Sequence, residues 1–367
     1  MSHGRAAIAA FGAIALGFIT VGSSQVARAA APAGAPAAGC EPDGPLNYVC
    51  GPVNAEDLVR LGNTRWLVTS GMDGPLNGGA AARGHLYLVD HERKTWSDWF
   101  PGTSPVFRQD TTLFKDCPGP VDPTRFSAHG LSVREQAAGR FRLYITAHGA
   151  REAIEVFDID ARGAQPSITW TGCVVLPEKV SANSVAILPD WGFVTTQFMD
   201  RSLPQQQAFG QVMSGQVNGQ LFEWHPGQSV QPIAGTQMSG ANGIVVSPDG
   251  QTLFVAAYGT HEVVRFQRGA GALRKDVVKL DITPDNLHWS ASGKVLAAGG
   301  NHAAAGGPPG AAGWSVLEID PQSLAVRRVT GGQRLTGMQG ATAAIDVGPE
   351  IWIGTFSGNR IGYLLAP

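Results

Sequence analysis

The sequence is poor in charged side chains. Asp, Glu, Lys and Arg make up 15% of its 367 residues, against roughly 25% in typical globular domains. The net charge is −2, and Lys and Arg form no run or stripe. Proteins that bind nucleic acid or anionic membrane surfaces usually carry such a basic patch. The composition therefore argues against nucleic acid and membrane surfaces as partners.

The sequence also lacks an apolar run long enough for a confident membrane span. Residues 6–21 are apolar, but the run is short and is interrupted by Gly and other small residues. Arg5 precedes it and small residues follow it, as in a secretory signal peptide. We expect a signal peptide over residues 1–29, a flexible Ala/Pro/Gly-rich tether over 30–39, and a secreted or periplasmic mature protein with no transmembrane anchor.

Cysteine is scarce, and Cys and His form no cluster of the kind that binds zinc. Four Cys in an exported protein suggest two disulfides. Three pairings are open, and the sequence alone does not decide among them. We favour Cys40–Cys50 with Cys117–Cys173, because the first bond closes a short loop and leaves the second pair.

No convincing amphipathic helix is present, whereas short alternating runs are frequent. The clearest group lies in residues 240–266, where apolar runs rich in Val, Ile and Phe indicate three strands. Ser247-Pro248-Asp249-Gly250 supplies the Pro and Gly typical of a tight turn. Residues 258–261 supply a second turn, so this stretch predicts a β-meander.

The meander recurs along the chain. Further first strands are expected at residues 56–60, 129–133, 183–188, 285–289 and 340–345. Six strand-only units of about 45–55 residues predict an all-β fold, a six-bladed β-propeller with one four-stranded sheet per blade, over residues 40–367. The insertions at residues 101–125 and 199–218 are expected to be loops between strands, with residues 204–219 the least structured.

One polar residue opens the first strand in five of the six units. These residues are Glu56, His129, Asn183, Asn242 and Asp285. Innermost strands line the channel of a propeller, so these side chains should converge at one mouth, with residues 340–342 of the sixth unit leaving an opening. Carboxylate and amide oxygens are the ligands that Ca²⁺ takes, with water and substrate completing about six to eight positions.

Each of these residues also has an ordinary structural explanation. Asn or Asp before a strand is commonly a turn or capping residue. Glu56 beside Asp57 can be a solvated pair, and a lone His129 is more often structural than catalytic. Turn chemistry does not explain why five polar residues occupy the same position in five units. This shared position favours a binding site.

Several motifs resemble one family. They are His129-Gly130-Leu131-Ser132 with Ala147-His148, Ala241-Asn242-Gly243-Ile244 before Ser247-Pro248-Asp249-Gly250, Ala55-Glu56-Asp57, and Asp285-Asn286. Together they resemble the paraoxonase/arylesterase lactonases, within the wider senescence-marker-protein, gluconolactonase and strictosidine-synthase group of six-bladed propellers. The resemblance spans nearly the whole chain, from Glu56 to Thr355.

The resemblance implies a set of site residues. A catalytic calcium would be bound by Glu56, Asn183, Asn242, Asp285 and Asn286, and a dyad of His129 and His148 would activate water. A second, structural calcium would use Asp57, the carbonyl of Leu131 and the position of Ser184, where Ser removes a charge that the family has. The C-terminal residues 363–365 contain no Cys for the family's ring-closing disulfide.

The function expected from these features is calcium-dependent hydrolysis of lactones, with aryl esters as a further substrate class. Calcium would polarise the carbonyl while His129 takes a proton from water and His148 orients it. His148 could instead be an ordinary inter-strand residue.

His302 is expected on a loop at the channel mouth, in contact with substrate. Five other histidines read as ordinary strand or turn residues: His85, His91, His225, His261 and His288. The alternatives are a sugar lactonase of the gluconolactonase type and a non-catalytic propeller that binds a ligand or protein.

Overall fold

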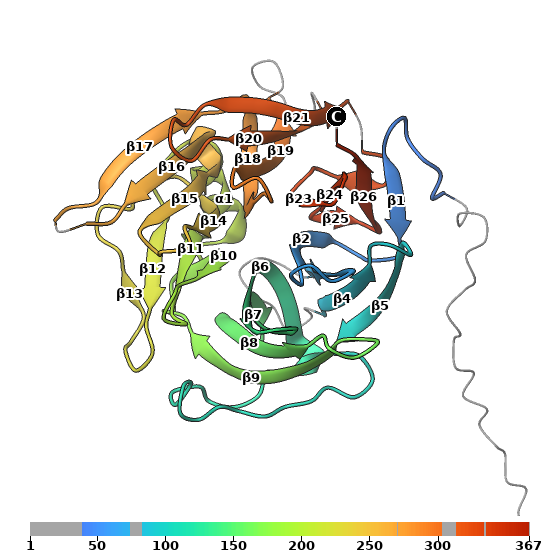
Figure 1. Cartoon of the computed structure of the whole chain (residues 1–367). Helices are drawn as coiled ribbons and strands as arrows, with labels where there is room; N and C mark the ends of the chain where they lie inside the picture. Colours follow the sequence, from blue (N-terminus) through green and yellow to red (C-terminus); the bar gives the residue numbers. More distant parts are fainter. Residues whose placement is uncertain (1–38, 74–82, 270, 303–312, 334, 367) are drawn as a thin grey trace, which may run out of the picture. The chain divides into compact units, whose positions relative to one another are not determined.

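The computed structural model describes residues 39–366, apart from residues 74–82, 270, 303–312 and 334. The expected signal peptide, 1–29, lies outside the described residues, as does the tether up to residue 38. The described chain forms a ring of four-stranded antiparallel sheets around a central axis (Figure 1). The expected all-β, six-bladed propeller is confirmed.

Each blade runs from an inner strand to an outer strand. The first three blades are β2 (Ala55–Arg60), β3 (Trp66–Gly71), β4 (His85–Asp90) and β5 (Thr95–Phe100); β6 (Phe126–Ala137), β7 (Arg140–Gly149), β8 (Ala153–Asp160) and β9 (Ser167–Val175); and β10 (Val180–Ile187), β11 (Phe193–Asp200), β12 (Gln220–Trp224) and β13 (Gln231–Pro232). The next two are β14 (Ala241–Val246), β15 (Thr252–Ala257), β16 (Glu262–Gln267) and β17 (Arg274–Lys279), and β18 (Ile282–Trp289), β19 (Val295–Asn301), β20 (Trp314–Ile319) and β21 (Val326–Gly332).

The sixth blade closes the ring with strands from both ends of the chain. It consists of β23 (Ala344–Val347), β24 (Glu350–Ile353), β26 (Arg360–Leu365) and the outer strand β1 (Asn47–Cys50). β1 pairs antiparallel with β26, with Val49 opposite Ile361 (Figure 1). The sequence did not indicate β1 as a blade strand. Its pairing lets backbone hydrogen bonds close the ring without a disulfide across the joint.

The two favoured disulfides are both present. Cys40 pairs with Cys50 at the end of β1, and Cys117 pairs with Cys173 on β9. The second bond joins the insertion between β5 and β6 to β9, the outer strand of the second blade. That insertion ends in a short 3₁₀ turn, Pro123–Arg125.

The hydrophobic core lies between neighbouring blades. The inner strand β10 is buried along its whole length, whereas the outer strand β17 is largely exposed. Phe100, Phe126 and Phe157 pack edge to face, with ring centroids 5.0 and 4.8 Å from Phe100. This packing joins the outer strand of the first blade to the second blade.

The expectation of loops without helices is wrong in one place. Residues Gln205–Met213 form α1, in the insertion between β11 and β12. Ala208 and Val212, four residues apart, are buried against Phe198 and Met199. Glutamines and Gly210 weaken the sequence signal, and tertiary packing of one apolar face stabilises the helix. A 3₁₀ turn, Tyr258–Thr260, and the short pair β22 (Met338–Gln339) and β25 (Ser357–Gly358) complete the described elements.

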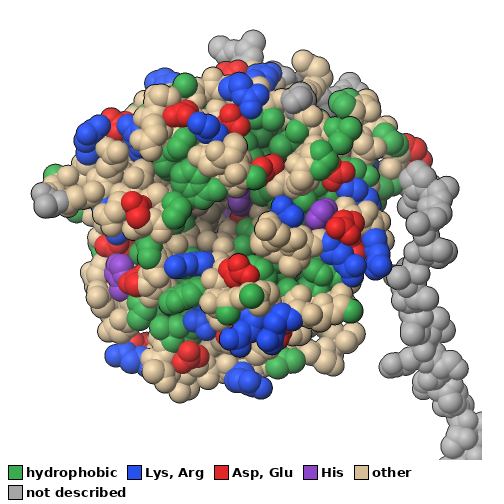
Figure 2. Space-filling model, in the orientation of Figure 1, with side chains coloured by type: hydrophobic (Ala, Val, Ile, Leu, Met, Phe, Trp, Pro, Cys, Tyr) green, Lys and Arg blue, Asp and Glu red, His purple; other side chains and the backbone are tan. Residues whose placement is uncertain are grey.

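The surface carries acidic and basic side chains close together over most of the face shown in Figure 2, whose centre is hollowed. This mixture agrees with the absence of a basic stripe in the sequence. Within the described ranges, no helix is long and apolar enough to cross a membrane.

Candidate metal and catalytic site

The inner strands of five blades share one irregularity. In each, two residues of the inner strand lie opposite one residue of the second strand, which is a β-bulge. The first residues of the bulges are Glu56, His129, Asn183, Asn242 and Asp285. A bulge re-aims its side chains relative to a regular strand, and here it turns five polar groups towards the axis.

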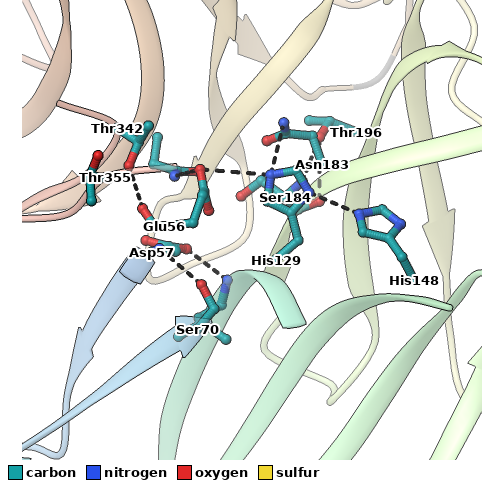
Figure 3. A network of polar contacts seen from close by, with 12 residues as sticks. Glu56, Asp57, Ser70, His129, His148, Asn183, Ser184, Thr196, Thr342 and Thr355 are labelled. Atoms are coloured by element: carbon teal, nitrogen blue, oxygen red, sulfur yellow. Dashed lines mark hydrogen bonds and ion pairs between the residues drawn. The ribbon is translucent and has the colours of Figure 1, made fainter. Parts of the chain in front are cut away.

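The bulges are fixed by close packing between blades and by hydroxyl groups within a blade. A Cβ on Gly130 would lie 2.4 Å from the Asn183 carbonyl oxygen, so the second bulge position in this blade requires Gly. Elsewhere the residue opposite the bulge accepts a backbone N–H: Ser70 Oγ accepts from Asp57 at 2.9 Å, and Thr196 Oγ1 accepts from Ser184 at 3.0 Å (Figure 3). These contacts fix the direction of the site residues.

The five side chains form the floor of a cavity of about 390 Å³ at one mouth of the channel. Asn54 and Asp73 also line it, and its walls are mainly apolar. The wall residues are Met72, Phe198, Phe209, Tyr258 and Phe356, with Gln205 from α1. Thr342, two residues before β23, donates a 2.6 Å hydrogen bond from its hydroxyl to the Glu56 carbonyl oxygen (Figure 3).

The floor presents oxygen atoms without partners. Glu56 Oε2, Asn183 Oδ1, Asn242 Oδ1 and Asn286 Oδ1 are buried and lack a hydrogen-bond partner among the described residues. Leaving a buried acceptor unsatisfied typically costs about 1–3 kcal/mol. Three of these residues line the cavity and Asn286 is bonded to Glu56, so four such oxygens from four blades indicate a bound group that is not part of the chain.

Burial disfavours the charged forms of the acids in this site. It raises the pKa of Glu56 to about 8, and the charge of Asp57 adds to the shift. Burial also raises the pKa of Asp285, with the charge of Glu56 acting in the same direction. A divalent cation would allow both carboxylates to ionise, because its charge offsets their desolvation and mutual repulsion.

The donor set fits calcium. Two carboxylates and three amide oxygens are hard ligands of the type that Ca²⁺ prefers. The part of the chain that the structure describes contains no group of three or more His, Cys, Asp and Glu side chains that could hold a metal, and the amides are what complete this set. Glu56, Asn183, Asn242, Asp285 and Asn286 are thus brought together as a candidate calcium site.

The two histidines of the expected dyad are in contact. His129 Nδ1 lies 2.9 Å from His148 Nε2, and both rings are buried (Figure 3). His129 Nε2 lies 3.4 Å from Asn183 Nδ2 and 3.7 Å from Glu56 Oε1. Burial lowers the pKa of His129 to about 3. A neutral His129 therefore borders the cluster of ligand oxygens.

Sequence reasoning missed a third member of this network. Glu152, 3% exposed, accepts a hydrogen bond from His148 Nδ1 through Oε2 at 2.9 Å. It lies in the turn between β7 and β8, four residues after His148. That spacing is the available signal, but only the turn geometry brings the two side chains together.

The residues expected for a second calcium do not fit a cation. Asp57 Oδ1 accepts from the Leu58 N–H at 2.8 Å and lies 2.7 Å from His288 Nε2, and Asp57 Oδ2 accepts from the Leu131 N–H at 2.7 Å. Ser184 adds no charge, and its carbonyl accepts the Thr195 hydroxyl. Protein donors occupy the position, and His288, read from the sequence as ordinary, supplies one of them.

His302 is exposed and is not among the described residues that line the cavity. Its ring packs against His261 at a centroid distance of 4.0 Å. A role in substrate contact stays a prediction.

Comparisons with known proteins bear on the fold. No protein-family model matches the chain, and none of the curated proteins matches it. Among solved structures, it is similar to a luciferin-regenerating enzyme, with 13% identity over 86% of this chain and 93% of that one, at a TM-score of 0.52. It is also similar to a protein classed as a gluconolactonase, with 13% identity over 88% and 91% of the two chains, at a TM-score of 0.53. The chain shares their fold. At this identity the likeness concerns the fold alone, and the narrower paraoxonase branch stays a prediction.

Proposed function

We propose that the chain is a calcium-dependent hydrolase of lactones, with aryl esters as a further substrate class. One observation carries the proposal: His129, paired with the buried His148, lines the same cavity as the unsatisfied ligand oxygens of Glu56, Asn183 and Asn242. A propeller that only binds a ligand has no need for a neutral imidazole at this position. The names of the two fold relatives, a gluconolactonase and a luciferin-regenerating enzyme, agree with small-molecule chemistry.

Five residues would hold the ion: Glu56, Asn183, Asn242, Asp285 and Asn286. When bound, calcium supplies a Lewis acid that polarises the substrate carbonyl. Asn286 donates a 2.8 Å hydrogen bond to Glu56 Oε1, which orients the carboxylate and leaves Oε2 towards the site. The chain thus presents a prearranged set of oxygens rather than flexible surface acids.

His129 is the general base of the proposed reaction. Attack of water breaks one O–H bond and forms a bond between the water oxygen and the carbonyl carbon. The released proton goes to His129, which returns it to the alkoxide when the ring C–O bond breaks. His148 holds the His129 ring through their 2.9 Å contact.

The cavity wall bears on the substrate. Phe198, Phe209, Tyr258 and Phe356 surround the polar floor, and Phe209 and Phe356 are 38% and 46% exposed at its rim. Apolar walls of this kind favour lactones with an alkyl or aryl substituent, because such groups gain by leaving water. A polyhydroxylated sugar lactone would need more hydrogen-bonding groups, so the gluconolactonase-type activity is the second candidate.

The proposed location is secreted or periplasmic. Two disulfides join all four Cys, and disulfides are typical of oxidising compartments.

The test is a substrate panel with and without calcium. Lactones with alkyl side chains, sugar lactones and aryl esters are assayed in calcium and again after a strong chelator. We expect hydrolysis of the alkyl-substituted lactones, lost on chelation and restored by calcium. Preference for sugar lactones would favour the second candidate. No hydrolysis of any member would leave a ligand-binding propeller as the better account.

A further inference from the structure

Glu152 is a buried carboxylate held by donors from three directions. Its Oε2 lies 2.9 Å from His148 Nδ1 and 3.8 Å from the Arg201 guanidinium, and its Oε1 accepts the backbone N–H of Ala182 at 2.7 Å. Burying a carboxylate is costly unless it is paired and hydrogen-bonded. Its three partners provide that pairing, and one of them is the outer histidine of the dyad.

The direction of these hydrogen bonds follows from what each group can donate. Glu152 faces the Arg201 guanidinium and accepts the Ala182 N–H, so its oxygens act as acceptors and the proton between Glu152 and His148 is on His148 Nδ1. A neutral His148 then has a lone pair on Nε2, and the 2.9 Å contact with His129 requires the proton on His129 Nδ1. The remaining nitrogen, His129 Nε2, keeps its lone pair. This atom faces Glu56 and Asn183 on the cavity floor.

We propose that Glu152 fixes the tautomers of both histidines and so makes His129 Nε2 the atom that accepts the proton of water. The inference rests on the proposed function, because it assigns Glu152 as a positioning residue for that base. Glu152 does not itself reach the cavity. It acts through His148 and determines which nitrogen of His129 is basic.

Glu152 also joins the dyad to the calcium ligands. The Ala182 N–H that it accepts belongs to the residue directly before Asn183, at the start of the β10 bulge. One carboxylate therefore holds both the histidine pair of the second blade and the bulge of the third. This link keeps the base and the ligand oxygens at a fixed separation.

Glu152→Gln is the informative variant because it keeps the shape and the number of hydrogen bonds. Its amide oxygen can still accept from Ala182, whereas its amide nitrogen would donate to His148 Nδ1. Each hydrogen bond in the series from residue 152 through His148 to His129 then reverses its direction. As a result, His129 Nε2 carries a hydrogen. Glu155→Gln is the matched control: Glu155 is equally buried on β8 but bonds to Arg151 and Trp170, away from the dyad.

The experiment combines steady-state kinetics at saturating calcium with ¹⁵N NMR of the histidine rings, in the calcium-loaded and the calcium-free protein. In the wild type we expect protonated Nδ1 and unprotonated Nε2 on both rings. In Glu152→Gln we expect the reversed tautomers, an unchanged calcium affinity, and a kcat reduced by roughly 10²–10⁴-fold. Glu152→Asp, which keeps the charge but is shorter, should lose less, and Glu155→Gln should keep its kcat and tautomers.

Two results would overturn the inference: wild-type tautomers in Glu152→Gln with turnover within a few-fold of the wild type, or a wild-type His129 that carries its proton on Nε2. A wild type without any hydrolytic activity would refute the proposed function instead. The ring ¹⁵N shifts would still decide the tautomer assignment, because they need no substrate. If Glu152→Gln does not fold, the wild-type spectra still decide the tautomer assignment. The kcat of Glu152→Asp then tests the role of Glu152.

Discussion

The side-chain amide of Asn286 donates a 2.8 Å hydrogen bond to Glu56 Oε1 across a sequence separation of 230 residues. It joins the fifth blade to the first and leaves Glu56 Oε2 and Asn286 Oδ1 buried without partners among the described residues. The sixth blade lies between these two blades and closes the ring with β1. Formation of the proposed metal site and closure of the ring therefore depend on the same blades.

Removal of calcium should lower the melting temperature. An ion that binds only the folded chain stabilises it by mass action, by about 2.7 kcal/mol when its concentration is 100 times Kd. The ligands come from four blades, so the ion bridges most of the ring. Differential scanning calorimetry with calcium and with a strong chelator measures the shift. A melting temperature indifferent to the chelator, with no calcium in elemental analysis, would refute the metal site.

Asn242→Ala should weaken calcium binding, because it removes a ligand oxygen that has no protein partner. We expect the calcium Kd to rise by about tenfold or more, since even outer partners of metal ligands contribute 10–100-fold. Titration calorimetry gives the Kd. Asn63→Ala is the matched control, because Asn63 is exposed in the turn between β2 and β3. Equal affinities in both variants would remove Asn242 from the ligand set.

One calcium per chain is expected, not two. Both oxygens of Asp57 already have protein partners in Leu58, Leu131 and His288, which disfavours a second ion. Metal analysis after dialysis and the stoichiometry of calcium titration both test this. A second tightly bound ion, lost in Asp57→Asn but retained in Asn242→Ala, would contradict it.

The stability of the metal-free protein should fall as the pH rises from 6.5 to about 8. Burial raises the pKa of Glu56 from 4.5 to about 8, so folding favours its protonated form and this stabilisation is lost as the pH approaches the folded-state value. His129 has a lowered pKa and adds no slope above its ordinary value of 6.5. Over this pH window each such carboxyl lowers the free energy of unfolding by about 2 kcal/mol at most.

Urea unfolding across this pH window measures the slope. The calcium-loaded protein should show little of it, because the ion keeps Glu56 ionised. Metal-free Glu56→Gln should show a smaller slope than the metal-free wild type. An identical slope in Glu56→Gln would mean that another group is responsible.

Much of the architecture could be predicted because it repeats. The alternating runs gave strands close to their observed bounds, as at Gln220–Trp224, and the polar residue that opens each inner strand occupies the first bulge position in five blades. The equivalent position of these residues in successive units carries this information in the sequence.

Contacts between distant residues were the part that could not be predicted. β1 becomes a blade strand only by pairing with β26, and α1 is stabilised by packing on Phe198. Glu152 and His288 have ordinary local sequences, and only the fold places them against His148 and Asp57. None of these contacts has a periodic signal along the chain.

The most direct test of the account is the turnover of His129→Gln at saturating calcium. Gln cannot serve as a general base, but it leaves the five calcium ligands in place. We expect the calcium Kd to stay at the wild-type value while kcat for lactone hydrolysis falls by roughly 10²–10⁴-fold. Near wild-type turnover in this variant would contradict the account, because His129 would then be a structural residue.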